Sequence, residues 1–142
     1  MYNFAMEETL KALLKKEGYS LTRPRKAVFN LLLNQPPQSM RELGQKAANK
    51  VDRATIYRTI ELFERLGIVR RINSGWKYKI ELSDVFTGHH HHFNCTSCGK
   101  TYDLPANPLL ETMIDTITAK EDFAPRGHQL EVYGLCPSCQ SS

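Results

Sequence analysis

The first 80 residues contain neither histidine nor cysteine, although the whole chain has five histidines and four cysteines. Imidazole and thiolate ligands for a metal ion can therefore come only from residues after position 80. No apolar run approaches the roughly 20 residues that a membrane-spanning helix needs. The N-terminal residues also lack the basic start and apolar stretch of a secretory signal, so we expect a cytoplasmic protein with no membrane partner.

Acidic side chains are scarce in the same first 80 residues, which carry 16 Lys and Arg against 7 Asp and Glu, a net charge of +9. Residues 81–142 carry 3 against 8, a net charge of −5, so the overall charge of +4 conceals two unlike halves. The basic half is a candidate for binding a polyanion. We therefore expect two small domains with different roles.

The first half has the pattern of a helical domain that ends in a hairpin. Apolar periodicity and capping residues predict four helices, beginning at Met6, Thr22, Ser39 and Asp52. Two β-rich runs follow, residues 68–72 and 76–82, and a Gly-containing turn at residues 73–75 joins them. Helices followed by such a hairpin indicate a winged helix-turn-helix domain.

The second half has the pattern of a small α+β unit. Residues 89–95 and 100–104 are expected to form strands, Asn107 to begin a helix, and residues 128–135 to form a further strand. About 55 residues rarely bury enough apolar surface to fold unaided. This unit therefore needs an internal cross-link, a partner subunit, or both.

Two Cys-x-x-Cys pairs can supply the cross-link. Cys95 and Cys98 are separated from Cys136 and Cys139 by 37 residues. Four thiolates around one ion form the closed tetrahedral site that is typical of structural Zn²⁺. Disulfides are the alternative, but a cytoplasmic chain disfavours them.

Four consecutive histidines occupy positions 89–92, inside the chain rather than at a terminus. Alternate residues of a strand face opposite ways, so His90 and His92 share one face while His89 and His91 share the other. The run can therefore supply two different metal sites, and His128 is a further candidate ligand. Imidazoles combined with carboxylates suit exchangeable divalent ions such as Fe²⁺, Zn²⁺ or Mn²⁺.

The fourth predicted helix carries residue types that suit DNA recognition. Its buried stripe is expected to be Ile56, Ile60 and Phe63, with Thr59 among the outward residues. Arginine, threonine and tyrosine side chains can contact base edges and phosphates in a major groove. The residues that we expect to contact DNA are Thr22, Arg23, Arg25, Arg53, Thr55, Tyr57, Arg58 and Lys77.

Three segments together resemble the ferric uptake regulator (Fur) superfamily. Residues 21–25, LTRPR, resemble its L-T-x-P-R motif, and residues 54–58, ATIYR, resemble its recognition-helix motif A-T-[VI]-Y-R. Residues 89–100, HHHHFNCTSCGK, resemble its H-H-x-H-x-x-C-x-x-C-G-K signature, which is highly specific. The likeness covers nearly the whole chain.

The resemblance implies a metal-dependent transcription regulator, expected to be a repressor of metal-uptake or oxidative-stress genes. It implies a DNA-binding domain at 1–82, a hinge at 83–88, and a dimerisation and metal-binding domain at 89–142. A homodimer would bind a pseudo-palindromic double-stranded operator, and whether dimers pair into tetramers stays open. The ligand sets it implies are Cys95, Cys98, Cys136 and Cys139 for structural zinc; Glu81, His90, His92 and Asp103 for the regulatory metal; and His89, His91, Glu111 and His128 for a second site.

The sequence departs from the family pattern at the regulatory site. The family usually takes a further histidine from the loop before the third helix, where this chain has residues 35–38, QPPQ. The segment between Glu81 and the histidines is also about two residues longer than usual, which leaves Asp84 as an alternative to Glu81. The regulatory metal therefore stays open, with Fe²⁺, Zn²⁺ and Mn²⁺ as candidates.

Two other classes of function compete with a regulator. An open site of histidines and carboxylates could activate water in a zinc hydrolase, but no general-base arrangement such as His-Glu-x-x-His is present. A metal buffer, or a zinc module that binds a protein partner, would show no sequence-specific and salt-sensitive DNA binding. We therefore expect a protein that is not an enzyme.

Overall fold

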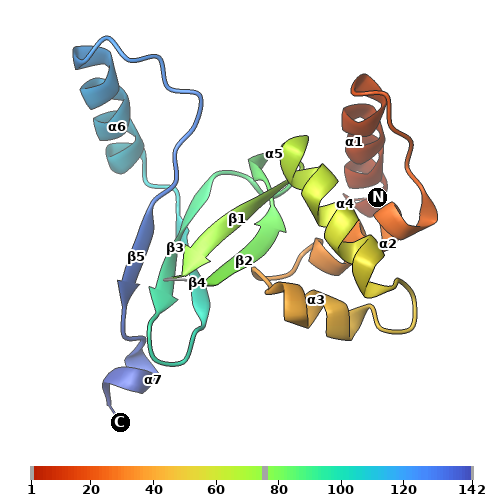
Figure 1. The fold of residues 1–142 in the computed structure, drawn as a ribbon. Coiled ribbons are helices and arrows are strands. Elements are labelled where there is room, and N and C mark those ends of the chain that lie inside the picture. The colour runs from red at the N-terminus through yellow and green to blue at the C-terminus, as the bar shows by residue number, and fades with distance from the viewer. Residues whose placement is uncertain (1, 75–76, 142) are drawn as a thin grey trace. The chain divides into compact units, whose positions relative to one another are not determined.

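The computed structural model describes residues 2–74 and 77–141, which fall into two compact units, residues 1–88 and residues 89–142 (Figure 1). The first unit consists of helices and a two-stranded sheet, and the second is built on a three-stranded sheet. This arrangement is the α+β architecture that the sequence predicts. No helix among the described residues is long and apolar enough to cross a membrane.

The helices of the first unit begin where their capping residues predict. Its elements are α1 (Tyr2–Lys16), α2 (Arg23–Leu32), α3 (Met40–Lys46), α4 (Arg53–Arg65), β1 (Val69–Ser74), β2 (Lys77–Leu82) and α5 (Asp84–Thr87). The Thr22 hydroxyl accepts the Arg25 N–H at 3.4 Å and starts α2. Ser39 and Glu42 form a reciprocal capping box, at 3.1 and 3.2 Å, that starts α3. Helix α1 begins four residues earlier than its apolar periodicity indicates.

The hairpin of the first unit pairs β1 with β2 in an antiparallel ladder in which Arg70 lies opposite Glu81. Residues 75 and 76, part of the predicted turn and strand, lie outside the described residues. The loop before α3 is bonded to β2, because Gln38 and Ile80 exchange backbone hydrogen bonds of 2.9 and 2.6 Å. The predicted hinge contains the short helix α5, which no sequence pattern indicated.

The core of the first unit is apolar and is shared by its helices and its hairpin. Leu10, Val28, Phe29 and Phe63 are at most 1% exposed, and Ile56, Ile60 and Ile80 are buried with them. The predicted stripe of α4 therefore faces the core. Thr59, which we expected on an outer face, is 5% exposed and lies on the buried side. Thr59 lies three residues after Ile56 and four before Phe63, so the helical period places it beside their buried face.

The second unit is a mixed sheet whose central strand carries the histidines. Its elements are β3 (His90–Cys95), β4 (Thr101–Pro105), α6 (Pro108–Lys120), β5 (Glu131–Gly134) and α7 (Pro137–Gln140). The strand order is β4-β3-β5, with β3 antiparallel to β4 and parallel to β5. Because parallel neighbours need a long crossover, the chain runs through α6 before it returns as β5. His92 consequently lies between Asp103 of β4 and Glu131 of β5.

The side chains buried in the second unit are polar or sulfur-containing. Among its described residues, the buried ones are His91, His92, Asn94, Cys95 and Cys136. Helix α6 buries none of its side chains, and Leu109 and Ile117 are 75% and 56% exposed. The apolar periodicity of α6 therefore corresponds to an exposed apolar face rather than to a core within this unit.

Candidate metal centres and nucleic-acid interface

The two Cys-x-x-Cys turns converge into a cluster of four thiols. Cys95 ends β3, Cys98 lies in the turn after it, and Cys136 caps the short helix that contains Cys139. Their sulfur atoms lie within 4.8 Å of one another, and the Sγ atoms of Cys98 and Cys136 are 3.8 Å apart. Sulfurs at about 2.3 Å from a tetrahedral zinc are about 3.8 Å from one another. The spacing suits one ion and exceeds the roughly 2.05 Å of a disulfide.

Backbone amides stabilise negative charge in this cluster. The N–H groups of Cys136 and Cys98 donate to Cys95 Sγ at 3.3 and 3.5 Å. These hydrogen bonds lower the pKa of Cys95 to about 5, and the bond from Cys136 has the larger effect. The thiolate form of Cys95 therefore dominates at neutral pH. The pKa of Cys139 rises to about 11, chiefly because its side chain hydrogen-bonds to that of Cys136. The metal-free cluster thus already holds a thiolate for a cation.

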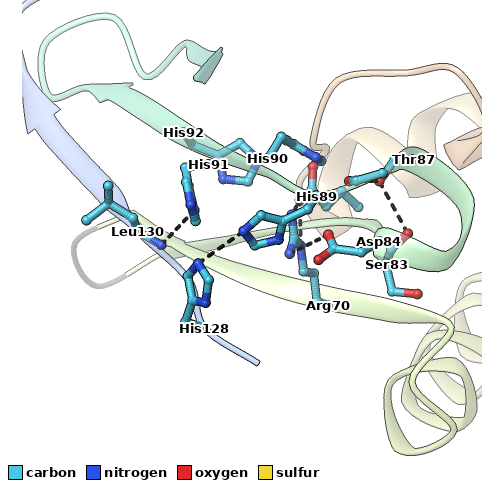
Figure 2. A network of polar contacts seen from close by, with 12 residues as sticks. Arg70, Ser83, Asp84, Thr87, His89, His90, His91, His92, His128 and Leu130 are labelled. Atoms are coloured by element: carbon cyan, nitrogen blue, oxygen red, sulfur yellow. Dashed lines mark hydrogen bonds and ion pairs between the residues drawn. The ribbon is translucent and has the colours of Figure 1, made fainter. Parts of the chain in front are cut away.

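One face of the histidine strand forms a second cluster with α6 and the segment before β5. His91 Nε2 lies 2.8 Å from Glu111 Oε1, and His128 Nε2 lies 2.7 Å from Glu111 Oε2. His89 Nε2 lies 3.1 Å from His128 Nε2 (Figure 2). It also lies 3.2 Å from Glu111 Oε2. One carboxylate and three imidazoles therefore point at a common centre, as nitrogen and oxygen ligands of a divalent ion would.

The Glu111 carboxylate is held in its charged form. Burial acts to raise the pKa of Glu111, but its hydrogen bond with His91 and the charges of His89 and His128 outweigh burial and lower it. The His91 ring is fixed from behind, because the Leu130 N–H donates to His91 Nδ1 at 3.2 Å (Figure 2). Its Nε2 atom is thereby directed toward Glu111. The structure thus brings together all four predicted residues of the second site.

The opposite face of the strand carries His90 and His92, and His92 has a carboxylate partner that the sequence did not reveal. His92 Nδ1 lies 2.9 Å from Glu131 Oε1, and Asn94 donates to Glu131 Oε2 at 2.8 Å. A histidine whose Nδ1 is held by a carboxylate presents Nε2 as its ligand atom. Asp103 is more loosely placed, because its Oδ1 lies 4.0 Å from His90 Nε2 and its side chain is 72% exposed.

Glu81 belongs to the first unit, where it is bound by an arginine. Arg70 Nη2 lies 2.6 Å from Glu81 Oε1, and Arg70 Nη1 lies 2.9 Å from Asp84 Oδ1. Both carboxylates that the sequence offers as hinge ligands are therefore attached to the same guanidinium. No sequence pattern singles out Arg70, and its position opposite Glu81 follows only from the strand register.

The predicted DNA-contacting residues gather on α2 and α4. Arg53, Tyr57 and Arg58 are exposed on α4, and Arg58 Nη2 donates to Thr55 Oγ1 at 3.1 Å. A shallow hollow between the two helices is lined by Thr22, Arg25, Thr55 and Arg58, among others. Arg23 is exposed at the start of α2, and Lys77 is exposed at the start of β2. Hydroxyl and guanidinium groups from two helices thus share one surface.

Comparison with known proteins agrees with this arrangement. The sequence model of the Ferric uptake regulator family matches residues 16–133. A ferric uptake regulation protein of Synechococcus elongatus is 32% identical over 141 residues, 94% of this chain and 95% of that protein. The peroxide-responsive repressor PerR of Staphylococcus epidermidis is 30% identical over 142 residues, 95% of this chain and 90% of that protein.

A solved structure extends the likeness to three dimensions. The ferric uptake regulator of Vibrio cholerae is 32% identical, with a TM-score of 0.71, over 87% of this chain and 96% of that one. The match therefore includes both the helical unit and the unit that holds the cysteine and histidine clusters. The chain belongs to the ferric uptake regulator family.

Proposed function

We propose that this protein is a metal-responsive, DNA-binding transcription regulator in which residues 1–82 bind DNA, residues 83–88 form the hinge, and residues 89–142 dimerise and bind metal. The observation that carries this proposal is the separation of chemistry between the units. The exposed basic helix lies in one unit and the imidazole and thiol clusters lie in the other. Family membership supports a regulator rather than an enzyme.

The four-cysteine cluster would hold a structural Zn²⁺. Its sulfur spacing suits a tetrahedral ion, and all four positions are filled by protein ligands, which leaves no open position for chemistry. Bound zinc supplies a cross-link between the turn after β3 and helix α7. Cys95 and Cys136 are buried, so the cross-link also replaces an apolar core in a unit that has little of one.

Glu81, His90, His92 and Asp103 would form the regulatory metal site, and His89, His91, Glu111 and His128 the second site. Both sets consist of imidazoles and carboxylates, which suit Fe²⁺, Zn²⁺ or Mn²⁺ and exchange more readily than four thiolates. An ion bound by residues on both sides of the hinge would favour one arrangement of the DNA-binding units. The coupling can be no larger than the ion's difference in affinity between arrangements, typically 1–3 kcal/mol.

The exposed apolar surface of the second unit supports a homodimer. Leu109 and Ile117 of α6 are more than half exposed, and Val132, Tyr133 and Leu135 near β5 are 41% to 50% exposed. Large exposed apolar surfaces of this kind mark interaction sites. A second copy would cover them and place two copies of α4 on a pseudo-palindromic operator.

The test compares the two faces of the histidine strand. The DNA is a duplex selected from random sequences for binding to the wild-type protein. We expect Mn²⁺ or Fe²⁺ to raise the affinity of the wild type for this duplex, and the double variant His90→Ala, His92→Ala to lose that increase. The matched pair His89→Ala with His91→Ala, on the other face of β3, should keep that rise. Binding would be measured by fluorescence anisotropy on protein that retains its structural zinc. Equal metal dependence in the His90/His92 variant and the wild type would refute the proposal.

A further inference from the structure

Arg70 bridges the two carboxylates at the end of the first unit. Its Nε and Nη2 atoms lie 2.7 and 2.6 Å from Glu81 Oε1, and its Nη1 atom lies 2.9 Å from Asp84 Oδ1 (Figure 2). The side chains of Arg70 and Glu81 are only 14% and 5% exposed. Charges this well shielded from water interact far more strongly than a surface pair.

The neighbouring Arg71 shows that this arrangement is not a general property of the strand. Arg71 faces the other side of β1, where it lies 2.7 Å from Glu64 and 4.3 Å above the ring of Tyr78. Its side chain is 45% exposed. The two arginines are adjacent and carry the same charge. Arg70 contacts Glu81 and Asp84, the two candidate hinge ligands, whereas Arg71 contacts Glu64.

We propose that Arg70 is a resident cation of the regulatory site, which competes with the incoming metal ion for Glu81 and Asp84 and so sets the metal concentration to which the protein responds. This proposal rests on the proposed function. A guanidinium cannot lose its proton at any physiological pH, so its charge remains when the metal arrives. The metal-free site is stabilised by the ion pairs, and a divalent ion must share those carboxylates with a like charge.

The geometry also explains how competition and binding can coexist. The Arg70 Nε and Nη2 atoms contact Glu81 Oε1 together, so the guanidinium orients that carboxylate. Asp84 shares the charge of the same guanidinium. Glu81 and Asp84 are therefore coupled through Arg70 rather than independent alternatives as the metal ligand. Removing Arg70 would take a compensating positive charge away from the buried Glu81, and a metal ion would then gain more by binding.

The experiment measures Co²⁺ binding by its visible absorption in protein that retains structural zinc. The absorption that is lost in the His90→Ala, His92→Ala variant is assigned to the regulatory site. We expect Arg70→Gln to bind Co²⁺ at that site on the order of tenfold more tightly than the wild type, the scale of changes beside a ligand shell. Arg71→Gln removes the same charge one residue away and should leave the affinity within about twofold, since its exposed charge is largely screened.

Unchanged or weaker Co²⁺ binding in Arg70→Gln would overturn the role of Arg70 while leaving the proposed function intact. A wild type with no absorption that depends on His90 and His92 would overturn both. A second measurement uses only the wild-type protein. In the ¹⁵N-labelled wild type, Zn²⁺ filling the regulatory site should shift the Arg70 Nε–H resonance and leave that of Arg71 in place. An Arg70 resonance that ignores the metal would also refute the proposal.

Discussion

The buried side chains of the first unit are almost all apolar, whereas those described in the second unit are imidazole, amide and thiol groups. Leu10, Phe29 and Phe63 pack with residues from every helix of the basic unit. In the acidic unit, the buried side chains include His91, His92 and Cys95. The first unit can therefore be stabilised by burial of apolar surface, whereas we propose that the second depends on a bound zinc ion and on a second copy of the chain.

The largest effect should come from removing the structural zinc. We expect Cys136→Ser to lose the ion and to unfold the second unit, while α1–α4 keep their structure. Loss of a structural zinc removes on the order of 10 kcal/mol of folding free energy. Zinc content and amide hydrogen exchange measure the two results, with Ser138→Ala in the same turn as the control. Protected amides in a zinc-free second unit would show that it has a sufficient core of its own.

A cavity in the apolar core should lower the stability of the first unit only. Phe63 is fully buried, so Phe63→Ala should lower the free energy of unfolding of that unit by roughly 3–5 kcal/mol. Phe4→Ala, at a side chain that is 69% exposed, should have little effect. Urea unfolding followed by circular dichroism gives both values. A loss of zinc from the Phe63 variant under native conditions would mean that the units are not stabilised separately.

A smaller effect is expected at the carboxylate behind His92. Glu131→Gln removes the charge that holds His92 Nδ1, so metal affinity at the proposed regulatory site should fall roughly tenfold. The structural zinc should remain. Glu121→Gln, at an exposed residue after α6, is the matched control. Cobalt titration measures the affinity, and ¹⁵N shifts of His92 report its tautomer; an unchanged tautomer and affinity would exclude a positioning role for Glu131.

The smallest expected effect concerns the acidity of the Cys95 thiol and the protons that zinc displaces. In the absence of a metal ion the pKa of Cys95 lies at about 5, below its ordinary value of 9.0, chiefly because the Cys136 N–H donates to its sulfur. Because Cys95 is already a thiolate at pH 7.5, zinc uptake there should release fewer than four protons. Calorimetry in buffers of different ionisation enthalpy counts them, and a release of four would contradict the shift.

The sequence predicts those features that depend on neighbouring residues. The starts of α2 and α3 follow from Thr22 and Ser39, whose side chains bond to amides three residues away. The alternation of His89 to His92 likewise follows from the two-residue period of a strand. The convergence of His89, His91, Glu111 and His128 was expected from the family resemblance, which carries information on residues far apart in the chain.

The sequence does not predict features that depend on long-range register. Glu131 meets His92 only because β5 runs parallel to β3, and Arg70 meets Glu81 only because of the hairpin register. No local pattern distinguishes Arg70 from Arg71, although their surroundings differ completely. Helices α5 and α7 were missed because four residues are too few to establish a helical period.

The most direct test of the central claim is reciprocity between metal and DNA. Suppose that a metal ion at the hinge selects the operator-binding arrangement and raises the affinity for the operator by some factor. The operator must then raise the affinity of the protein for that ion by the same factor. Both constants can be measured on the wild-type protein with its structural zinc retained, using Mn²⁺ paramagnetic resonance and fluorescence anisotropy. We predict equal factors of about 5 to 150. A metal affinity that is the same with and without operator would contradict the account.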